Sequence, residues 1–268
     1  MSDDTSNLDR SIRIHPPVGR GDFVATVPAG PKLEIGPFTR PAFTGPDVRY
    51  FDVMSADEIR SEAVRYKSDA TLAPKEIHYV ARDIALGDIP ERFVAVYSSH
   101  TIEHTFDCIG HVNDVARCLP VGGRYYLVIP DKRYCFDYFK PTATIGRVIE
   151  AAEYRPTEYG MAVWVDRSII GTHSTPARHW AGDHGELHKP DASARVAAAI
   201  REYKSGYRSP MGTHVWCFTP TRFAEIMTIC HEIGYTGMKI TDLYPTKRDT
   251  FEFYAVLEKT DAGATASL

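Results

Sequence analysis

The sequence lacks long apolar runs, and this excludes a membrane-spanning helix from our expectations. Its longest apolar stretches, such as residues 93–97 and 125–129, have five residues, whereas a spanning helix needs roughly 20. The polar start, Met1-Ser-Asp-Asp, has neither the basic nor the apolar region of a signal peptide. We therefore expect a cytoplasmic protein that has no membrane partner.

A basic excess is also missing. The 268 residues include 31 Lys+Arg against 35 Asp+Glu, a formal net charge of −4, whereas nucleic-acid binders normally carry surplus positive charge. The five cysteines contain no C-x-x-C pair, which indicates reduced, buried thiols rather than a disulfide framework. With 43% hydrophobic residues, the chain can bury a core, so we expect a globular protein without a nucleic-acid partner. A homodimer is compatible with this composition.

Short apolar strands alternate with helices from residue 31 onward. Ser55 and Glu58 form a capping box, Asp107 is an N-cap, and Thr219 is an N-cap followed by Pro220 at the first helical position. Strands separated by helices at this spacing predict a mostly parallel sheet with helices on both faces. The first five predicted strands are residues 32–35, 48–52, 77–81, 93–98 and 124–129.

The last two predicted strands, residues 238–243 and 251–257, have only a short loop between them. They most simply pair as an antiparallel hairpin at a sheet edge. The fold class expected is α/β: a Rossmann-like, seven-stranded, mostly parallel sheet with helices on both faces and an antiparallel C-terminal hairpin.

One domain over residues 31–260 is the expected organisation. Residues 1–30 are predicted to be an irregular lead-in, and residues 261–268 a disordered tail. A segment of about residues 140–212 is inserted between the fifth strand and the final helix. We expect this segment, with candidate helices at 145–154 and 192–203, to fold over the active site as a cap and to supply acceptor specificity.

Four motifs surround the strand ends, where open α/β sheets bind ligands. They are Leu33-Glu-Ile-Gly36, Ser98-Ser-His-x-x-Glu-His104, Leu119-Pro-x-Gly-Gly123 and Ile129-Pro-Asp-Lys-Arg-Tyr134. In order and spacing they resemble the class I S-adenosylmethionine-dependent methyltransferases, specifically their type 11-like branch. The resemblance covers roughly residues 31–140 and 213–259.

The resemblance implies S-adenosyl-L-methionine as cofactor and assigns it residues. The turn at 34–36 would approach the methionyl part, Asp52 would bind the ribose hydroxyls, Asp83 would face the adenine amino group, and residues 98–100 would line the floor near the sulfonium. The complete cofactor-binding set expected is Glu34, Gly36, Phe38, Arg40, Asp52, Val53, Asp83, Ile84, Ser98, Ser99 and His100. The family's usual G-x-G-x-G loop is reduced here to Gly36 followed by Pro37. Proline has a restricted φ and no N–H, so the loop must take another shape.

His100 and His104 are the predicted catalytic residues under this resemblance. Methyl transfer needs an aligned acceptor, and a base when that acceptor is a hydroxyl or a protonated nitrogen; histidine has a suitable pKa. The alternative for His104 is a structural hydrogen bond within its loop. The pair also fits the H-x-x-E-H pattern of inverted zinc peptidases. Because His100 directly follows a strand and the helix begins near Asp107, we predict no metal site.

The predicted acceptor site draws on three segments. They are the turn after the fifth strand, the histidine-rich loop 173–188, whose spacings fit no common metal motif, and the approach to the final helix, for which a packed aromatic corner is the alternative. The residues are Arg133, Tyr134, His173, His179, His214 and Trp216.

These predictions converge on methyl transfer from S-adenosyl-L-methionine to oxygen or nitrogen of a small polar acceptor, such as a sugar or a secondary metabolite. Three alternatives stay open. One is a non-catalytic binding module of the same fold, which the reduced glycine loop would suit. The others are an enzyme of this fold with altered chemistry and a metal-dependent hydrolase.

Overall fold

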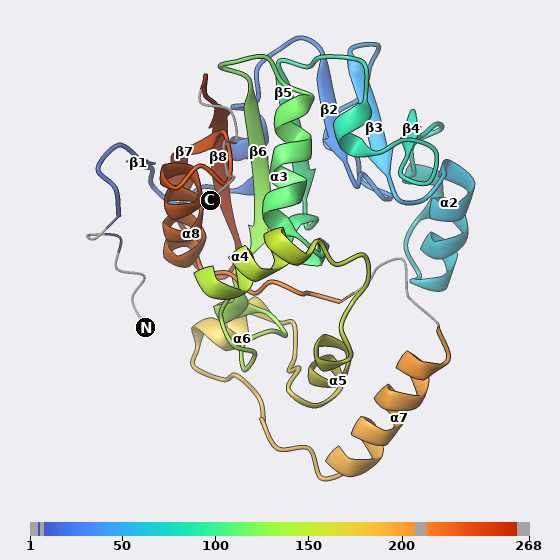
Figure 1. The fold of residues 1–268 in the computed structure, drawn as a ribbon. Helices are drawn as coiled ribbons and strands as arrows, with labels where there is room; N and C mark the ends of the chain where they lie inside the picture. The colour runs from blue at the N-terminus through green and yellow to red at the C-terminus, as the bar shows by residue number, and fades with distance from the viewer. Residues whose placement is uncertain (1–4, 6–7, 207–212, 262–268) are drawn as a thin grey trace.

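The computed structural model describes residue 5 and residues 8–206 and 213–261. Its centre is a mixed sheet that has eight strands within these ranges (Figure 1). The strands are β1 (Arg13–Ile14), β2 (Lys32–Ile35), β3 (Val48–Asp52), β4 (Tyr79–Val80), β5 (Ala95–Ser99), β6 (Arg124–Pro130), β7 (Met238–Tyr244) and β8 (Glu252–Lys259). Their order across the sheet is β1-β7-β8-β6-β5-β2-β3-β4.

Successive strands of the chain are added first on one side of β2 and then on its other side, and this change of direction positions the site. From β2 the chain steps outward through β3 to β4, then returns to place β5 and β6 on the other side of β2, all in parallel. Strand β8 is antiparallel to both β6 and β7. Such a reversal between parallel neighbours leaves a crevice beyond their carboxyl ends.

Eight strands rather than seven is a correction of the sequence prediction. Arg13 and Ile14, within the segment expected to be irregular, pair in parallel with Asp242 and Leu243 of β7. The Arg13 guanidinium also contacts the Asp242 carboxylate at 2.7 Å. A two-residue strand is too short to show alternation in sequence, and its partner lies at the other end of the chain. Because β1 covers β7, the β7–β8 pair is not the edge of the sheet.

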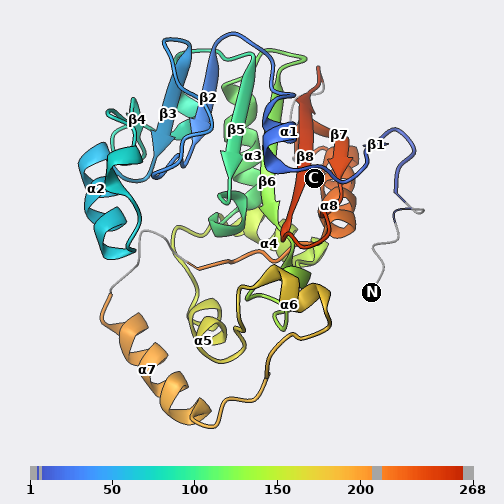
Figure 2. The ribbon, with the colours of Figure 1, turned by 180° about the vertical axis from the view of Figure 1, so that it is seen from behind.

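Helices cover both faces of the sheet unequally (Figures 1 and 2). Helices α3 (Cys108–Arg117) and α8 (Pro220–Glu232) cover the face of the larger apolar core. On the opposite face the short helix α1 (Arg20–Val24), also inside the expected lead-in, buries Phe23 against tyrosines of β6, β7 and β8. Helix α2 (Ala56–Arg65) follows β3.

The predicted helix starts are confirmed by their capping contacts. The Ser55 side chain accepts a hydrogen bond from the Glu58 amide, and the Glu58 carboxylate accepts one from the Ser55 amide. Asp107 caps α3 through the Gly110 amide at 2.8 Å, and Thr219 caps α8. These side chains satisfy backbone donors that a helix cannot pair internally.

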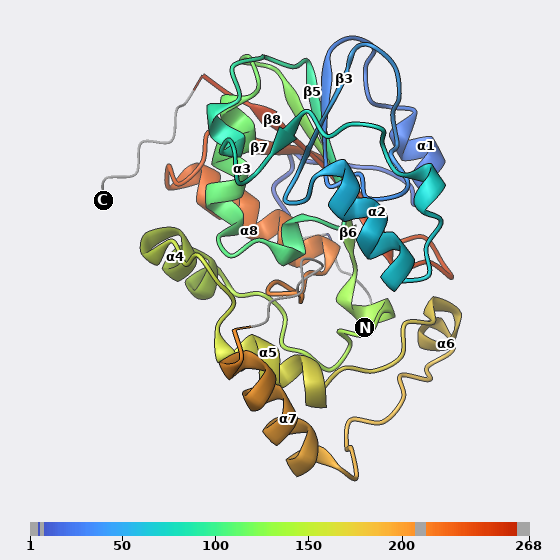
Figure 3. The ribbon, with the colours of Figure 1, turned by 90° about the vertical axis from the view of Figure 1, so that its right-hand side faces the viewer.

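Between β6 and α8 the chain forms a helical excursion beyond the carboxyl ends of the strands (Figure 3). It contains α4 (Ile145–Tyr154), α5 (Met161–Ile169), α6 (Pro176–Trp180) and α7 (Ala192–Lys204). We call residues 140–206 the cap segment. Trp164 of α5 is buried against Ala199 of α7, and its Nε1 donates to the Glu202 carboxylate at 3.3 Å.

Apart from Asp261, the predicted tail lies outside the described residues. Among the described helices, none combines the length and apolar character needed to cross a membrane.

Candidate active site

A cavity of about 540 Å³ opens at the carboxyl ends of β2, β3 and β5. It therefore lies at the reversal of strand order. Its walls come from the strand ends, the segment after β5, helix α3 and the cap segment. The lining residues are Ile35, Gly36, Phe38, Phe51, Asp52, Val53, Met54, His100, Thr101, His104, Thr105, Phe106, His111, Thr157, Glu158 and Tyr159.

The turn after β2 has the altered shape that the single glycine requires. Gly36 has φ +68°, and a Cβ there would stand 3.1 Å from Thr101 Oγ1. Only glycine fits this position without strain, because it combines a left-handed backbone with a close neighbour. Phe38 also has a positive φ, +43°, and both residues face the cavity.

Glu34 does not line the cavity and instead holds the loop that follows the turn. Its buried carboxylate accepts hydrogen bonds from the backbone amides of Ala42 at 2.7 Å and Phe43 at 3.1 Å. Burial raises the pKa of Glu34 to about 7, although both hydrogen bonds oppose the shift. Its observed contacts fasten the loop that ends at Phe43; none of them is directed toward the cavity.

Asp52 ends β3 and presents a buried carboxyl group to the cavity. One oxygen accepts a hydrogen bond from the Met54 amide at 2.9 Å. Burial raises the pKa of Asp52 to about 6, so the group is ionised at neutral pH. The neighbouring Val53 is exposed at the rim.

The predicted adenine contacts lie elsewhere. Asp83 is exposed, Ile84 packs against the apolar core, and neither lines the cavity. Their loop instead borders a second cavity of about 690 Å³ through Ala81 and Ala85. The two cavities share wall residues, including Phe51 and His111.

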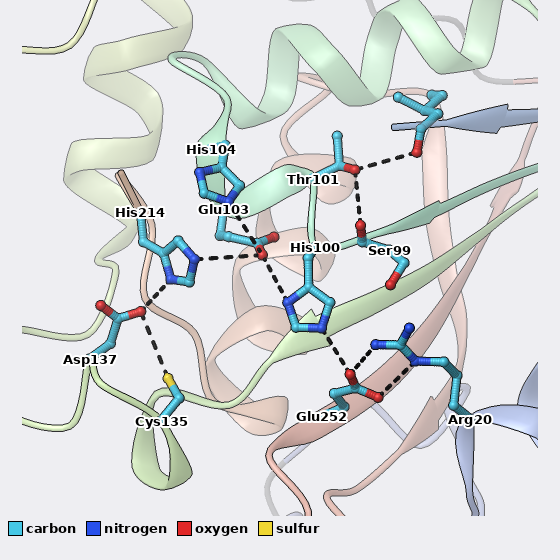
Figure 4. Close-up of polar contacts among 11 residues, drawn as sticks. Arg20, Ser99, His100, Thr101, Glu103, His104, Cys135, Asp137, His214 and Glu252 are labelled. Atoms are coloured by element: carbon cyan, nitrogen blue, oxygen red, sulfur yellow. Dashed lines mark hydrogen bonds and ion pairs between the residues drawn. The ribbon is translucent and has the colours of Figure 1, made fainter. Parts of the chain in front are cut away.

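His100 lies between two carboxylates that favour its protonated form, which argues against the predicted role of a base. Its Nε2 lies 2.8 Å from Glu252 and its Nδ1 lies 3.4 Å from Glu103, while Arg20 holds Glu252 from the other side (Figure 4). Burial alone would lower the pKa of His100, but the two carboxylates outweigh it and raise the pKa to about 9. A histidine that is already protonated cannot accept a proton at neutral pH.

His104 has the opposite protonation state. It closes a short 3₁₀ turn after β5 and lines the cavity. Burial lowers its pKa to about 4, despite the nearby Glu103 carboxylate. His104 is thus neutral at pH 7 and, of the two predicted catalytic histidines, it alone can accept a proton.

His214 lies behind His104 rather than in the cavity. The two rings meet edge to face, with centroids 4.6 Å apart. His214 Nδ1 is hydrogen-bonded to the Asp137 carboxylate (Figure 4). Lys140 Nζ lies 2.7 Å from the other oxygen of Asp137. Burial would raise the pKa of Asp137, but His214 and Lys140 lower it below its usual range.

Sequence reasoning missed Glu103 and Asp137. Glu103 is completely buried among three histidines, and its signal was its place inside the H-x-x-E-H pattern. Asp137 carries no comparable signal, because its partner His214 comes from a segment 77 positions further along the chain.

The other predicted site residues lie apart from the cavity. Ser98 Oγ is hydrogen-bonded to the Tyr125 hydroxyl of the neighbouring strand β6 at 2.7 Å, whereas Arg40 is exposed. Ser99 is partly buried and does not line the cavity. Trp216 is buried, and its Nε1 donates to the Thr105 carbonyl at 2.8 Å. This packing agrees with the alternative of an aromatic corner rather than with a residue of the acceptor pocket.

The remaining predicted acceptor residues lie in the turn after β6 and in the cap segment. The Arg133 guanidinium pairs with the Asp131 carboxylate, and the Tyr134 ring stacks on the Trp180 ring with centroids 3.9 Å apart. His179 Nε2 is hydrogen-bonded to the His173 carbonyl at 3.1 Å. None of these predicted residues lines the cavity.

The strand order and layers define a Rossmann-like α/β fold. No protein-family model matches the chain, and no curated protein matches it in sequence. Several solved structures are similar. The CcbJ methyltransferase from Streptomyces caelestis has 13% identity and a TM-score of 0.44, over 90% of this chain and 93% of that one. An S-adenosylmethionine-dependent methyltransferase from Clostridium acetobutylicum has 10% identity and a TM-score of 0.44, over 90% of each chain.

A third similar structure is the magnesium protoporphyrin IX methyltransferase from Synechocystis with bound S-adenosylhomocysteine. It has 11% identity and a TM-score of 0.35, over 88% of this chain and 77% of that one. With TM-scores below 0.5, these similarities decide neither the ligand nor the activity of this chain. The residues of the cavity carry that argument.

Proposed function

We propose that the protein is an S-adenosyl-L-methionine-dependent methyltransferase of the type 11-like branch. Its acceptor would be oxygen or nitrogen of a small polar molecule, such as a sugar or a secondary metabolite, in the cytoplasm. The observation that carries the proposal is the cavity at the reversal of strand order, with the Gly36 turn and the buried Asp52 carboxylate on its wall. Ligand sites of this fold class lie at that crevice.

The cavity offers complementary groups for each part of the cofactor. Its volume of about 540 Å³ falls within the usual range for small-molecule sites, roughly 300–1,000 Å³. An ionised Asp52 would accept hydrogen bonds from two ribose hydroxyls. The positive charge of His100, beside the Gly36 turn, would suit the carboxylate of the methionyl group.

The transfer itself requires little from the protein beyond alignment and proton removal. The acceptor's lone pair would form the new bond to the methyl carbon as the carbon–sulfur bond breaks, leaving its electron pair on the sulfur. A neutral His104 would take the proton of the acceptor. Its lowered pKa of about 4 makes it a modest base, so proton removal would accompany rather than precede methyl transfer.

The cap segment would close the cavity and shape its acceptor half. Thr157, Glu158 and Tyr159 of this segment line the wall, and the Tyr159 hydroxyl donates to the His104 carbonyl at 3.2 Å. This contact couples the cap to the proposed base. Exclusion of water strengthens electrostatic interactions inside such a site.

Incubation with S-adenosyl-L-methionine and a panel of hydroxyl and amine acceptors tests the proposal. We expect S-adenosylhomocysteine and a methylated acceptor in equal amounts, measured by mass spectrometry. Calorimetry with S-adenosylhomocysteine runs in parallel. Absence of binding at millimolar ligand would overturn the proposal and favour the non-catalytic module. Binding accompanied by a product other than a methylated molecule would favour altered chemistry.

A further inference from the structure

Glu103, His104 and His214 form a cluster that the proposed methyl transfer does not fully use. Their ligand atoms lie within 4.8 Å of one another. Glu103 Oε1 is 4.0 Å from His104 Nε2 and 3.9 Å from His214 Nε2. From this geometry we infer that the three side chains bind a divalent transition-metal ion, Zn²⁺ by the chemistry of its donors. Two imidazoles with one carboxylate form a known ligand set for zinc that keeps an open position.

The state of Glu103 is the second observation that points to an ion. Its side chain is completely buried, and neither carboxylate oxygen makes a hydrogen bond with a described residue. Three imidazole nitrogens lie within 4.0 Å of Glu103 Oε1, and His100 Nδ1 is the closest of the three at 3.4 Å. The cation beside Glu103, His100, lies closer to Glu252, at 2.8 Å, so it compensates the buried charge of Glu103 only in part. A buried carboxylate is strongly unfavourable unless it is fully paired or coordinates a metal.

The spacing leaves room for an ion between the donors. Zinc bonds of about 2.0–2.1 Å in tetrahedral geometry place neighbouring ligand atoms about 3.4 Å apart. The observed separations of 3.9 and 4.0 Å are slightly wider. A shift of a few tenths of an ångström in each side chain would therefore complete the coordination.

His214 is already oriented as a ligand. Its Nδ1 is hydrogen-bonded to Asp137, so Nε2 is the nitrogen that faces Glu103 (Figure 4). Metal-bound histidines almost always use their second nitrogen in this way, and the carboxylate fixes the ring and its tautomer. Lys140 holds Asp137 in turn at 2.7 Å.

The two segments that supply the ligands are fastened to each other by their backbones. The amides of Val215 and Trp216 donate to the Glu103 carbonyl at 2.8 and 3.2 Å. The cluster is thus held in place before any ion binds, as an effective binding site requires. Because His104 also lines the cavity, the ion would lie at the cavity floor, where its open position could take an oxygen ligand.

Cobalt substitution of the untagged protein tests the site. After removal of metal with a chelator, titration with Co²⁺ should give one equivalent of bound ion with the visible absorption of four- or five-coordinate Co²⁺. Zn²⁺ should then displace it. No stoichiometric Co²⁺ or Zn²⁺ binding by the folded protein would overturn the inference.

Matched variants locate the ion. His104→Ala removes one proposed ligand, and His188→Ala removes an exposed imidazole from the cap segment. We expect the dissociation constant for Zn²⁺ to rise by at least about 100-fold in His104→Ala, given that even outer-shell substitutions cost about 10–100-fold, and to stay within threefold in His188→Ala. Equal affinities in the two variants would contradict the site.

Glu103→Gln provides an independent check that also reports on folding. Zn²⁺ should raise the Tm of the wild type and of His188→Ala, because an ion that binds only the native state stabilises it. It should leave the Tm of a folded Glu103→Gln unchanged. A Zn²⁺-dependent rise of wild-type size in Glu103→Gln would overturn the assignment of Glu103. If Glu103→Gln does not fold, His104→Ala decides the question by the same measurement.

This inference does not depend on the proposed methyl transfer, and the two can fail separately. Calorimetry of S-adenosylhomocysteine with metal-free protein reports on the cofactor alone, and Co²⁺ titration reports on the ion alone. With an ion bound, His104 would act as a ligand rather than as a free base. Ion binding without cofactor binding would support the inferred metal site and overturn the proposed methyltransferase activity.

Discussion

Two groups of histidines in this protein differ in the side chains that surround them. The strand-end group, His100, His104 and His214, lies among the buried carboxylates of Glu103, Asp137 and Glu252. In the cap group, His173, His179 and His184, the rings contact one another, backbone carbonyls and the Tyr138 ring. Among the described residues, only the strand-end group includes three donors close enough to share an ion. The surrounding carboxylates, and not the number of histidines, therefore indicate which group belongs to the candidate active site.

The largest expected contrast between the two groups is in turnover. We expect His104→Gln to lower kcat by about 10²-fold or more, the usual range for loss of a positioned acid or base, with cofactor affinity unchanged. His184→Gln, in the cap group, should change kcat by less than threefold. The kcat of both variants is measured from the release of S-adenosylhomocysteine with an acceptor found by screening. Equal losses of kcat in the two variants would contradict a catalytic role that is specific to His104.

The next contrast compares two carboxylates that the sequence treats as equivalent. Asp52→Asn should weaken binding of S-adenosylhomocysteine by about 10-fold or more, because hydrogen bonds to charged groups contribute about 1.5–3 kcal/mol. Asp83→Asn should change affinity by less than threefold, since Asp83 is exposed and does not line the cavity. Calorimetry on both variants decides the point. A larger loss of affinity in Asp83→Asn than in Asp52→Asn would support the adenine contact that the family resemblance assigns to Asp83.

His100 and the cap-group histidines predict opposite pH dependence of stability. The pKa of His100 is raised from 6.5 to about 9, so its contribution is fully present below pH 6.5 and is lost as the pH rises through 9. The pKa values of His179 and His184 are lowered, mainly by burial, so their contribution is lost as the pH falls below 6.5.

Urea unfolding across the pH range measures this difference. His100→Gln should flatten the alkaline limb of the stability curve between about pH 6.5 and 9. The paired variant His179→Gln, His184→Gln should flatten only the acid limb. An alkaline limb that is unchanged in His100→Gln would show that His100 is not held as a cation.

The smallest expected effect comes from two glycines with similar backbones. Gly36 and Gly182 have φ of +68° and +87°, but a Cβ meets a neighbour within 4 Å only at Gly36. Alanine at either position should cost about 1–2 kcal/mol of unfolding free energy for the left-handed backbone. Gly36→Ala should additionally weaken cofactor binding, whereas Gly182→Ala should not. Denaturant titration and calorimetry measure the two effects.

Much of the fold could be predicted because its signals are local. The capping residues Ser55, Asp107 and Thr219 mark helix starts directly in the sequence, and each makes the expected contact. Strand β1 could not be predicted, because two residues carry no periodicity and their pairing depends on β7 at the far end of the chain.

The candidate site was predictable only where strand ends determine it. Gly36 and Asp52 reach the cavity because each directly follows or ends a parallel strand. The protonation of His100 depends on Glu252, which is 152 positions away, and the cluster of Glu103 with His214 depends on how the segment before α8 returns to β5. Such contacts are set by tertiary packing and leave no spacing pattern in the sequence.

A crystal structure of the protein with S-adenosylhomocysteine tests the central claim most directly. The account predicts the ligand in the cavity at the ends of β2, β3 and β5, with its ribose hydroxyls on the Asp52 carboxylate and its sulfur on the side of His104. A ligand bound elsewhere, or a cavity without ligand in crystals grown at saturating concentration, would contradict it.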